Sequence, residues 1–359
     1  MTDVVYRRLA KRVDEIPNGF PASKSGVELE MLAKMFTPAE AHLASVMKLR
    51  PESAASIAER AAVDTDTALG HLKMMAEKGL ISIAEAPDGS LFSLRPFVVG
   101  FYEEWLPRMD KEFAWLFERY YQETRAGILG EGPSVHRVIP VDAAVPFEVE
   151  IFPYESARAL LESAKSWGVR DCICRVQQRL IGRGCDHPIE TCLVFAPTEN
   201  AFEGSEITRS LSKEEAFDIL REAEEAGLVH SSGNYRRGNA YICNCCTCSC
   251  GVMRGIAEFG IKTAVAHSAF RAEVEAEMCI ACGTCVDRCS FHALALTDGR
   301  VRIDTDRCAG CGLCVTTCPV GALRLERVPE DASRKPPATI LHWMRDRAKT
   351  RGISLDDIT

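Results

Sequence analysis

Two cysteine runs of identical spacing constrain this chain more than any other feature. Cys279, Cys282, Cys285 and Cys289 are spaced C-x2-C-x2-C-x3-C, and Cys308, Cys311, Cys314 and Cys318 repeat that spacing 29 residues later. The surroundings repeat with the same offset, as where Val274 matches Ile303. Such spacing lets one tight loop present three thiolates to a metal cluster, while the fourth comes from elsewhere. Zinc ligands, in contrast, usually come as separated C-x2-C pairs.

This duplication resembles the bacterial ferredoxins that hold two 4Fe-4S clusters, and we assign the resemblance to residues 267–328. In that family the last cysteine of each run ligates the cluster of the other run. The resemblance therefore implies a first cluster on Cys279, Cys282, Cys285 and Cys318, and a second on Cys308, Cys311, Cys314 and Cys289. Ser290 stands where proline usually follows the last cysteine, which removes no ligand.

Nine further cysteines mark residues 147–266, which we expect to form an α/β domain. They are Cys172, Cys174, Cys185, Cys192, Cys243, Cys245, Cys246, Cys248 and Cys250. Inert buried cysteine explains a lone thiol, but it explains poorly the five cysteines among residues 243–250. The segment resembles the cysteine-rich halves of ferredoxin-type proteins of anaerobic bacteria.

Three interpretations of these nine cysteines stay open. Four of them bind one more 4Fe-4S cluster, or eight bind two, or they bind zinc or act as a dithiol relay. Soft thiolates next to an iron–sulfur module favour clusters, so we expect two clusters in the chain with a third or fourth open, and zinc as the weaker alternative. Arg170, Arg175 and Arg254 are candidates to offset the cluster charge, and His187 is a further candidate ligand, although a lone histidine is more often structural.

Residues 27–100 carry helix signals followed by a hairpin signal. Thr37, Pro38 and Glu40 predict a capping box with proline in the first turn. The segments LISIAEA and LFSLRPF flank the turn PDGS, which predicts two paired strands. Three helices and a hairpin in this order resemble the winged helix-turn-helix domain of bacterial regulators, over about a fifth of the chain.

The charge of this segment argues against DNA binding. A recognition helix beginning near Asp66 would expose Asp66, Thr67, Gly70, His71 and Lys73. Residues 24–95 contain eight Lys/Arg and ten Asp/Glu, a net charge of −2, and the wing carries Asp88. Since phosphate binding requires Lys and Arg on the helix and wing, we favour docking on a partner protein or a second copy of the chain.

The remaining segments complete an α+β multidomain prediction. Residues 101–146 are expected to form an aromatic helix broken near Pro107 and then a linker. Within 147–266 we predict a strand at 148–152, a helix at 154–167, and a helix that Ser212 and Glu215 begin with a capping box. Residues 329–359 are expected to form a linker and a terminal helix.

Composition limits the setting of the chain. The 17 cysteines would suggest disulfides in a secreted protein, but the N-terminus MTDVVYRRLAKRV has charges and no apolar signal core. No apolar run reaches the ~20 residues of a membrane span. We therefore predict a cytoplasmic protein with reduced thiols, for which an anaerobic setting is reasonable. The net charge of −8 favours basic partners.

The sequence favours electron transfer to or from a partner oxidoreductase over self-contained catalysis. It has no G-x-G-x-x-G nucleotide motif, no P-loop and no nucleophile with an evident base. Two alternatives remain: a redox-sensing winged-helix regulator, and an oxidoreductase with a catalytic cluster in the middle domain. Winged-helix proteins with an added aromatic helix often dimerise, which leaves a homodimer open.

Overall fold

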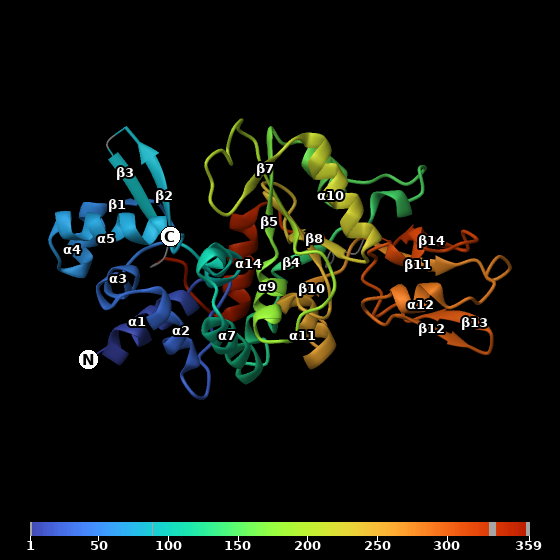
Figure 1. Cartoon of the computed structure of the whole chain (residues 1–359), viewed down its shortest axis with the longest axis horizontal. Coiled ribbons are helices and arrows are strands. Elements are labelled where there is room, and N and C mark those ends of the chain that lie inside the picture. Colours follow the sequence, from blue (N-terminus) through green and yellow to red (C-terminus); the bar gives the residue numbers. More distant parts are fainter. Residues whose placement is uncertain (1, 88, 330–334, 357–359) are drawn as a thin grey trace. The chain divides into compact units, whose positions relative to one another are not determined.

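The computed structural model describes residues 2–87, 89–329 and 335–356, and the chain divides into two compact units (Figure 1). Unit 1 comprises residues up to Glu131, Gln177–Gly182 and the residues from Met344 onward, and unit 2 comprises Gly132–Val176 and Arg183–Trp343. Among the described residues, no helix combines the length and the apolar character that crossing a bilayer requires.

Unit 1 begins with a helix that the sequence reasoning missed, α1 (Thr2–Asp14). Tyr6, Leu9 and Val13 are buried along one side of this helix, at the spacing of an amphipathic stripe. This periodicity was the sequence signal from which α1 could have been predicted. Next comes α2 (Val27–Met35), which contacts the later helix α7 (Lys111–Glu123).

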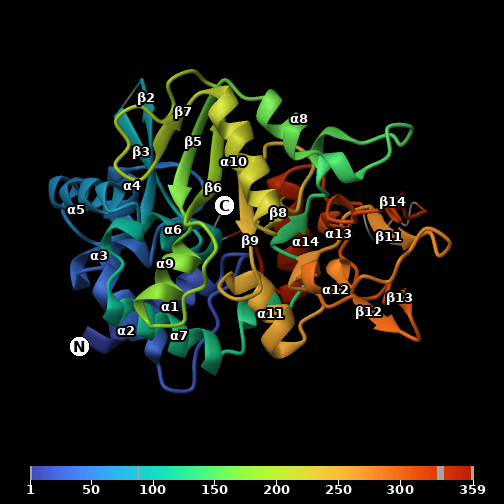
Figure 2. The same ribbon diagram turned by 45° about the vertical axis from the view of Figure 1, so that its right-hand side comes forward.

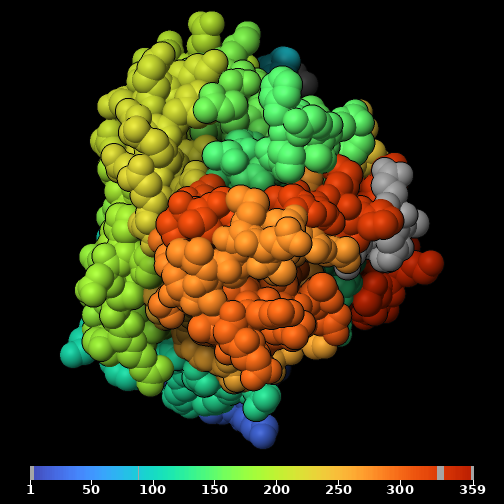
Figure 3. Space-filling model, turned by 90° about the vertical axis from the view of Figure 1, so that its right-hand side faces the viewer, coloured from blue at the N-terminus to red at the C-terminus, as the bar shows by residue number. Residues whose placement is uncertain are grey.

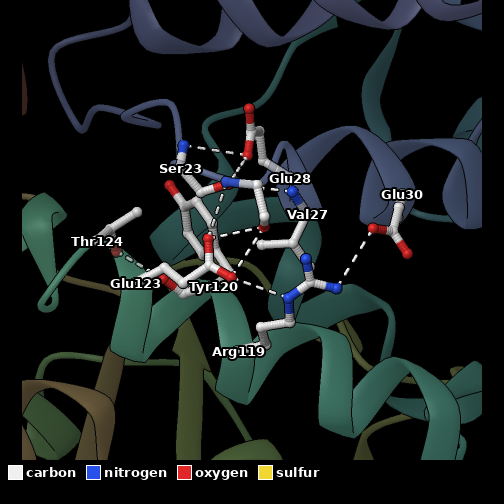
Figure 4. Close-up of polar contacts among 9 residues, drawn as sticks. Ser23, Val27, Glu28, Glu30, Arg119, Tyr120, Glu123 and Thr124 are labelled. Atoms are coloured by element: carbon white, nitrogen blue, oxygen red, sulfur yellow. Dashed lines mark hydrogen bonds and ion pairs between the residues drawn. The ribbon is translucent and has the colours of Figure 1, made fainter.

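Polar contacts join α2 to α7 (Figure 4). Arg119 of α7 pairs with Glu123 at 2.9 Å and with Glu30 of α2 at 3.5 Å. Tyr120 donates its hydroxyl to the carbonyl of Pro21 at 3.0 Å, and burial raises its pKa well above the usual value. Tyr120 therefore acts as a neutral hydrogen-bond donor inside unit 1.

The predicted helix and hairpin signals are confirmed between residues 37 and 94. The Thr37–Glu40 capping box is present at the start of α3 (Pro38–Ala44), with proline in the first turn. The hairpin strands pair antiparallel, and Asp88 lies outside the described residues. The elements after α3 are β1 (Glu52–Ser53), α4 (Ala54–Ala61), α5 (Thr65–Glu77), β2 (Ile81–Ala86) and β3 (Gly89–Leu94), with sheet order β1-β3-β2.

The aromatic segment breaks near Pro107 as predicted. The short helix α6 (Tyr102–Glu104) and a 3-10 turn (Leu106–Arg108) precede α7. Phe113, Phe117 and Tyr121 are buried, so these aromatics pack inside unit 1. At the other end of the chain, the predicted terminal helix is confirmed as α14 (Ile340–Arg351), whose buried Arg347 donates to the carbonyl of Pro17 at 2.7 Å.

Unit 2 is built on a seven-stranded sheet with strand order β10-β4-β8-β9-β6-β5-β7, of which Figure 2 labels β5, β6, β7, β8 and β9. Only the β10–β4 pair is parallel among these described strands. The sheet is therefore mainly antiparallel, in contrast to the parallel sheets of many α/β domains. The strands are β4 (His136–Val138), β5 (Ser166–Asp171), β6 (Glu190–Ala196), β7 (Arg209–Leu211), β8 (Val229–Gly233), β9 (Tyr241–Cys245) and β10 (Val265–Ala266).

Three predictions in this region are wrong. Residues 148–152 form no strand, and the carbonyl of Glu150 instead accepts a hydrogen bond from Arg327. The helix predicted at 154–167 is only α8 (Ala157–Glu162), and strand β5 already begins at Ser166. Within β5, the side chain of Thr208 leaves no room for a Cβ atom at Gly168. The expected linker contains β4, whose partners β8 and β10 are distant in sequence.

One face of the sheet is covered by α8 and α10 (Lys213–Glu225). The predicted Ser212–Glu215 capping box is confirmed at the start of α10. Ala216 and Leu220 of α10 pack with Leu193, Phe195 and other strand residues in one apolar core. Two further helices, α9 (Ile173–Leu180) and α11 (Gly251–Phe259), follow β5 and the cysteine-rich loop after β9.

The cysteine repeats form an interleaved module, and the 29-residue duplication extends to its elements. Strand β11 of the first repeat pairs with β14 of the second, and β12 pairs with β13. Each small sheet therefore takes one strand from each repeat. The elements are β11 (Phe270–Val274), α12 (Thr284–Arg288), β12 (Leu294–Thr297), β13 (Arg300–Ile303), α13 (Leu313–Thr316) and β14 (Leu323–Arg327).

Candidate metal and cluster sites

The structure brings each predicted ferredoxin quartet together around its own cavity. One cavity is lined by Cys279, Cys282, Cys285 and Cys318, and the other by Cys289, Cys308, Cys311 and Cys314. Each cavity thus receives three thiols from one repeat and the fourth from the other. This grouping is the one that the resemblance implied, and iron ligation by these thiols stays a prediction.

The loop that carries the second quartet packs closely against neighbouring parts of the protein. Gly310 and Gly312 both have positive φ, at 69° and 82°. A Cβ at Gly310 would run into the carbonyl of Phe270, and one at Gly312 would lie 2.6 Å from the Cβ of Ala144. Only glycine suits these two positions.

Backbone N–H groups point at several of these sulfurs. The sulfur–nitrogen distances are 3.2–3.4 Å, and the donor–acceptor pairs are Ala272 to Cys308, Ala293 to Cys289, and Ala322 to Cys318. The last two contacts are equivalent in the two repeats. Hydrogen bonds to cysteine sulfur stabilise the thiolate and raise the reduction potential of a cluster bound to it.

The two cavities differ in exposure. Cys282 is exposed in the first, beside the exposed side chains of Met278 and Ile280. In the second, Cys314 is buried and burial raises the pKa of Cys311 to about 12. The first cavity therefore has an outward route to a protein surface.

The second cavity lies against the segment that follows β4 and against the end of α10. Val141 donates its N–H to the carbonyl of Cys311 at 2.9 Å. Arg288, which lines this cavity, donates to the carbonyl of Glu225 at 2.9 Å. Figure 3 shows the repeat module in orange, with the green segment that contains α8 along its upper edge. These contacts join the repeat module to the segment after β4 and to α10 within unit 2.

The nine middle cysteines fall into two groups, and the larger group is a closed ring of six thiols. The ring runs Cys172–Cys174–Cys250–Cys245–Cys243–Cys192 and back to Cys172, and each thiol influences the pKa of the next. The Cys250 thiol donates to the Cys245 sulfur at 3.2 Å. The thiols come from the end of β5, the start of α9, β6, β9 and the residue before α11.

The environment of the ring favours thiolate at two of its positions. Hydrogen bonds from Cys174 and Cys192 hold the pKa of Cys172 well below its usual range, with the charge of Arg175 adding to the effect. Hydrogen bonds from Cys243 and Cys250 lower the pKa of Cys245 to about 6. Buried thiolates of this kind are the soft donors that iron–sulfur clusters require.

Arg175 lies between the ring and the remaining cysteines. Its side chain is 1% exposed, its Nη1 donates to the Asn244 carbonyl at 3.0 Å and to the Cys246 sulfur at 3.8 Å, and its charge acts on Cys172 and Cys192. Its Nε has no hydrogen-bond partner among the described residues. Of the three predicted arginines, Arg175 is thus the one shown near several thiols.

The other two predicted arginines have different contacts. Arg170 donates to the hydroxyl of Thr208 at 2.7 Å, and Arg254 forms an ion pair with Glu258 at 2.6 Å. These contacts give no support to a charge-offsetting role for either guanidinium.

The second group of middle cysteines includes the histidine that the sequence marked as a further candidate. The donor atoms of Cys185, His187, Cys246 and Cys248 all lie within 4.8 Å of one another. Cys185 and His187 are on the loop between α9 and β6, and Cys246 and Cys248 follow β9. Burial alone would raise the pKa of Cys185, but hydrogen bonds with Ser249, Cys248 and His187 lower it to about 6.

A buried histidine near the ring was not predicted. The Nδ1 atom of His136 in β4 forms a 3.4 Å hydrogen bond with the Ser231 hydroxyl. This hydroxyl lies 3.6 Å from the Cys245 sulfur. Its Nε2 has no hydrogen-bond partner in the part of the chain that the structure describes, and desolvation lowers its pKa to about 4. His136 was not predicted because it lies in the segment that was expected to be a linker.

Comparison with known proteins identifies the repeat module. A family model described as a 4Fe-4S dicluster domain matches residues 272–325. No curated protein and no solved structure matched the chain. Iron–sulfur clusters are therefore supported for the C-terminal repeats, and together with the many cysteines they fit an electron-transfer role.

Proposed function

We propose that this chain is an electron-transfer protein in which the two ferredoxin-type clusters exchange electrons with a partner oxidoreductase. The observation that carries the proposal is the grouping of the repeat cysteines into two cavities of four thiols. Bound there, 4Fe-4S clusters supply one-electron chemistry without a bound substrate. The free state of all 17 cysteines agrees with use of the thiols as ligands.

We assign the first cluster to Cys279, Cys282, Cys285 and Cys318, and the second to Cys289, Cys308, Cys311 and Cys314. The interleaved pairing of β11 with β14 and of β12 with β13 supports this crossed assignment, because it carries each fourth cysteine to the other repeat. The backbone N–H groups that point at Cys289 and Cys318 hold both crossing ligands in place.

The six-thiol ring is the best candidate for a third 4Fe-4S cluster, taking four of its six cysteines as ligands. It offers buried thiols from several elements, with the Arg175 guanidinium nearby to offset negative charge. Two clusters on eight of the nine cysteines fit less well, because Cys185, Cys246 and Cys248 gather around His187 instead.

Electrons would enter or leave at the first cluster. Its Cys282 is exposed, and Met278 and Ile280 are 49% and 62% exposed beside it. The site of the second cluster lies against the segment that follows β4, a strand of the sheet that holds the ring, through the contact of Val141 with Cys311. The partner redox protein would dock over the exposed cysteine, and the ring would extend the path inward.

We propose that the N-terminal segment with α3, α4, α5 and the β2–β3 hairpin is a winged helix used for docking rather than for DNA binding. The order of helices and strands supports the winged helix. Asp64 and Asp66 are exposed at the start of α5, where a DNA-reading helix would need basic residues. A redox-regulator function is accordingly the weaker candidate.

Anaerobic coulometric titration tests the function. We expect the wild-type chain to accept about three electrons, one per 4Fe-4S cluster, and to pass them to a viologen dye. Cys311→Ala should accept about one electron fewer and transfer more slowly, whereas the exposed control Thr305→Ala should match the wild type. Cys311→Ala with undiminished uptake and rate would overturn the assignment.

A further inference from the structure

The distances among Cys185, His187, Cys246 and Cys248 fit four ligands around a single ion. The Cys185 and Cys246 sulfurs are 4.0 Å apart, and the Cys248 sulfur lies 3.7 Å from Nδ1 of His187. Zinc bonds of about 2.3 Å to sulfur and about 2.0 Å to nitrogen, at tetrahedral angles, place neighbouring ligand atoms roughly 3.5–3.8 Å apart. Small side-chain adjustments would complete this geometry.

The same distances do not suit a cubane. A 4Fe-4S cluster places a separate iron under each ligand, so its four ligand atoms stand farther apart than those around one ion. Among residues 2–87, 89–329 and 335–356, this is the only group of three or more His, Cys, Asp or Glu donors that closes within 4.8 Å. The ferredoxin quartets, which are built for cubanes, do not close this tightly.

The donor set also indicates the metal. Three thiolates and one imidazole form one of the usual structural zinc sites, closed to a fifth ligand. Three thiolates exceed the charge of one Zn²⁺ by one negative charge, and the buried guanidinium of Arg175 contacts Cys246 at 3.8 Å. The Ser249 hydroxyl lies 3.3 Å from the Cys185 sulfur and supplies an outer hydrogen bond of the kind that orients zinc ligands.

The position of the site explains what an ion there would do. Along residues 243–250 the two quartet cysteines, Cys246 and Cys248, lie between ring cysteines, because Cys243 and Cys245 precede them and Cys250 follows them. An ion held by the quartet would tie this loop to the loop after α9. It would thereby fix the backbone that carries half of the six ring thiols.

We propose that Cys185, His187, Cys246 and Cys248 bind one structural zinc ion, separate from the iron–sulfur clusters, which holds the cysteine-rich loop in place. The zinc site stands independently of the electron-transfer function, since it requires no cluster on the ring.

Metal analysis of anaerobically purified full-length variants tests the site. We expect about one zinc per chain in the wild type and less than about a tenth of that in Cys248→Ser, with unchanged iron from the ferredoxin quartets. Cys282→Ser is the matched variant, because it also replaces an exposed cysteine. It should lose about four irons and keep its zinc.

Two further variants separate ligation from general damage. His187→Cys should keep its zinc, because four thiolates also form a zinc site. Asp186→Ala, at the exposed residue between two of the ligands, should keep zinc as well. Zinc-edge X-ray absorption of the wild type, which does not detect iron, should give a sulfur shell at about 2.3 Å with one nitrogen at about 2.0 Å.

Two results would overturn the proposal: a wild-type chain without zinc, and zinc that persists in Cys248→Ser. If Cys248→Ser kept its zinc and lost about four irons, the result would also place a cluster on these residues. A chain with zinc but only about eight irons would leave the zinc site standing and remove only the third cluster.

Discussion

Cys318 is the residue through which the second cysteine run contributes a thiol to the cavity of the first run. It belongs to the second cysteine run but lines the cavity of the first, four residues before an N–H donor at Ala322. If ligation follows the cavities, removal of Cys318 must affect the cluster of Cys279, Cys282 and Cys285 rather than that of its own run.

Double variants test this crossing. Cys318→Ala should lose about four irons per chain. Adding Cys282→Ala should cost no further iron, because both residues would serve one cluster, whereas adding Cys311→Ala should remove about four more. Iron analysis with EPR of the reduced variants measures the effect. The opposite pattern, with Cys311→Ala adding nothing, would show that each run binds its own cluster.

The sequence allowed the grouping of some candidate site residues to be predicted but not that of others. Three thiols of each repeat quartet could be predicted from their spacing within a short loop, whereas the crossing fourth thiol was implied by the resemblance to two-cluster ferredoxins. The division of the nine middle cysteines could not, because Cys185 and Cys246 are 61 residues apart and meet only through the sheet. The position of His136 near the ring could not be predicted for the same reason, because its neighbours come from the distant strands β8 and β9.

Elements with local signals were predicted well, and those that depend on distant partners were not. The capping boxes of α3 and α10 both formed, because they need only residues three positions apart. Residues 148–152 alternate like a strand but have no neighbouring strand to pair with. Conversely, β4 carries only three residues and is fixed by β8 and β10.

The cap of α10 gives a prediction at this scale. Ser212 accepts from the Glu215 N–H at 3.2 Å, and Glu215 accepts from the Ser212 N–H at 2.7 Å. Ser212→Ala should lower the free energy of opening the first turn of α10 by about 1 kcal/mol. Amide hydrogens in that turn should therefore exchange roughly five-fold faster. Hydrogen–deuterium exchange measures this. The exposed control Glu222→Ala should leave that turn unchanged, and equal protection in both variants would show that the cap contributes little.

At the scale of the whole molecule, unit 2 holds all the cysteines of the chain. It combines two thiol quartets in the repeat module with a thiol ring and with a mixed Cys/His quartet on loops next to the sheet. Unit 1 carries the helices and hairpin for which we propose docking, and a homodimer through them stays a prediction. We therefore propose redox chemistry for unit 2 and recognition for unit 1.

The number of clusters tests this account most directly. Iron and acid-labile sulfide should be measured per chain on anaerobically purified protein, with EPR of the dithionite-reduced sample. The account predicts about twelve irons and twelve sulfides, at four per cubane. About eight would contradict it by leaving the six-thiol ring without a cluster, and about sixteen would contradict it by requiring a fourth cluster where we place zinc.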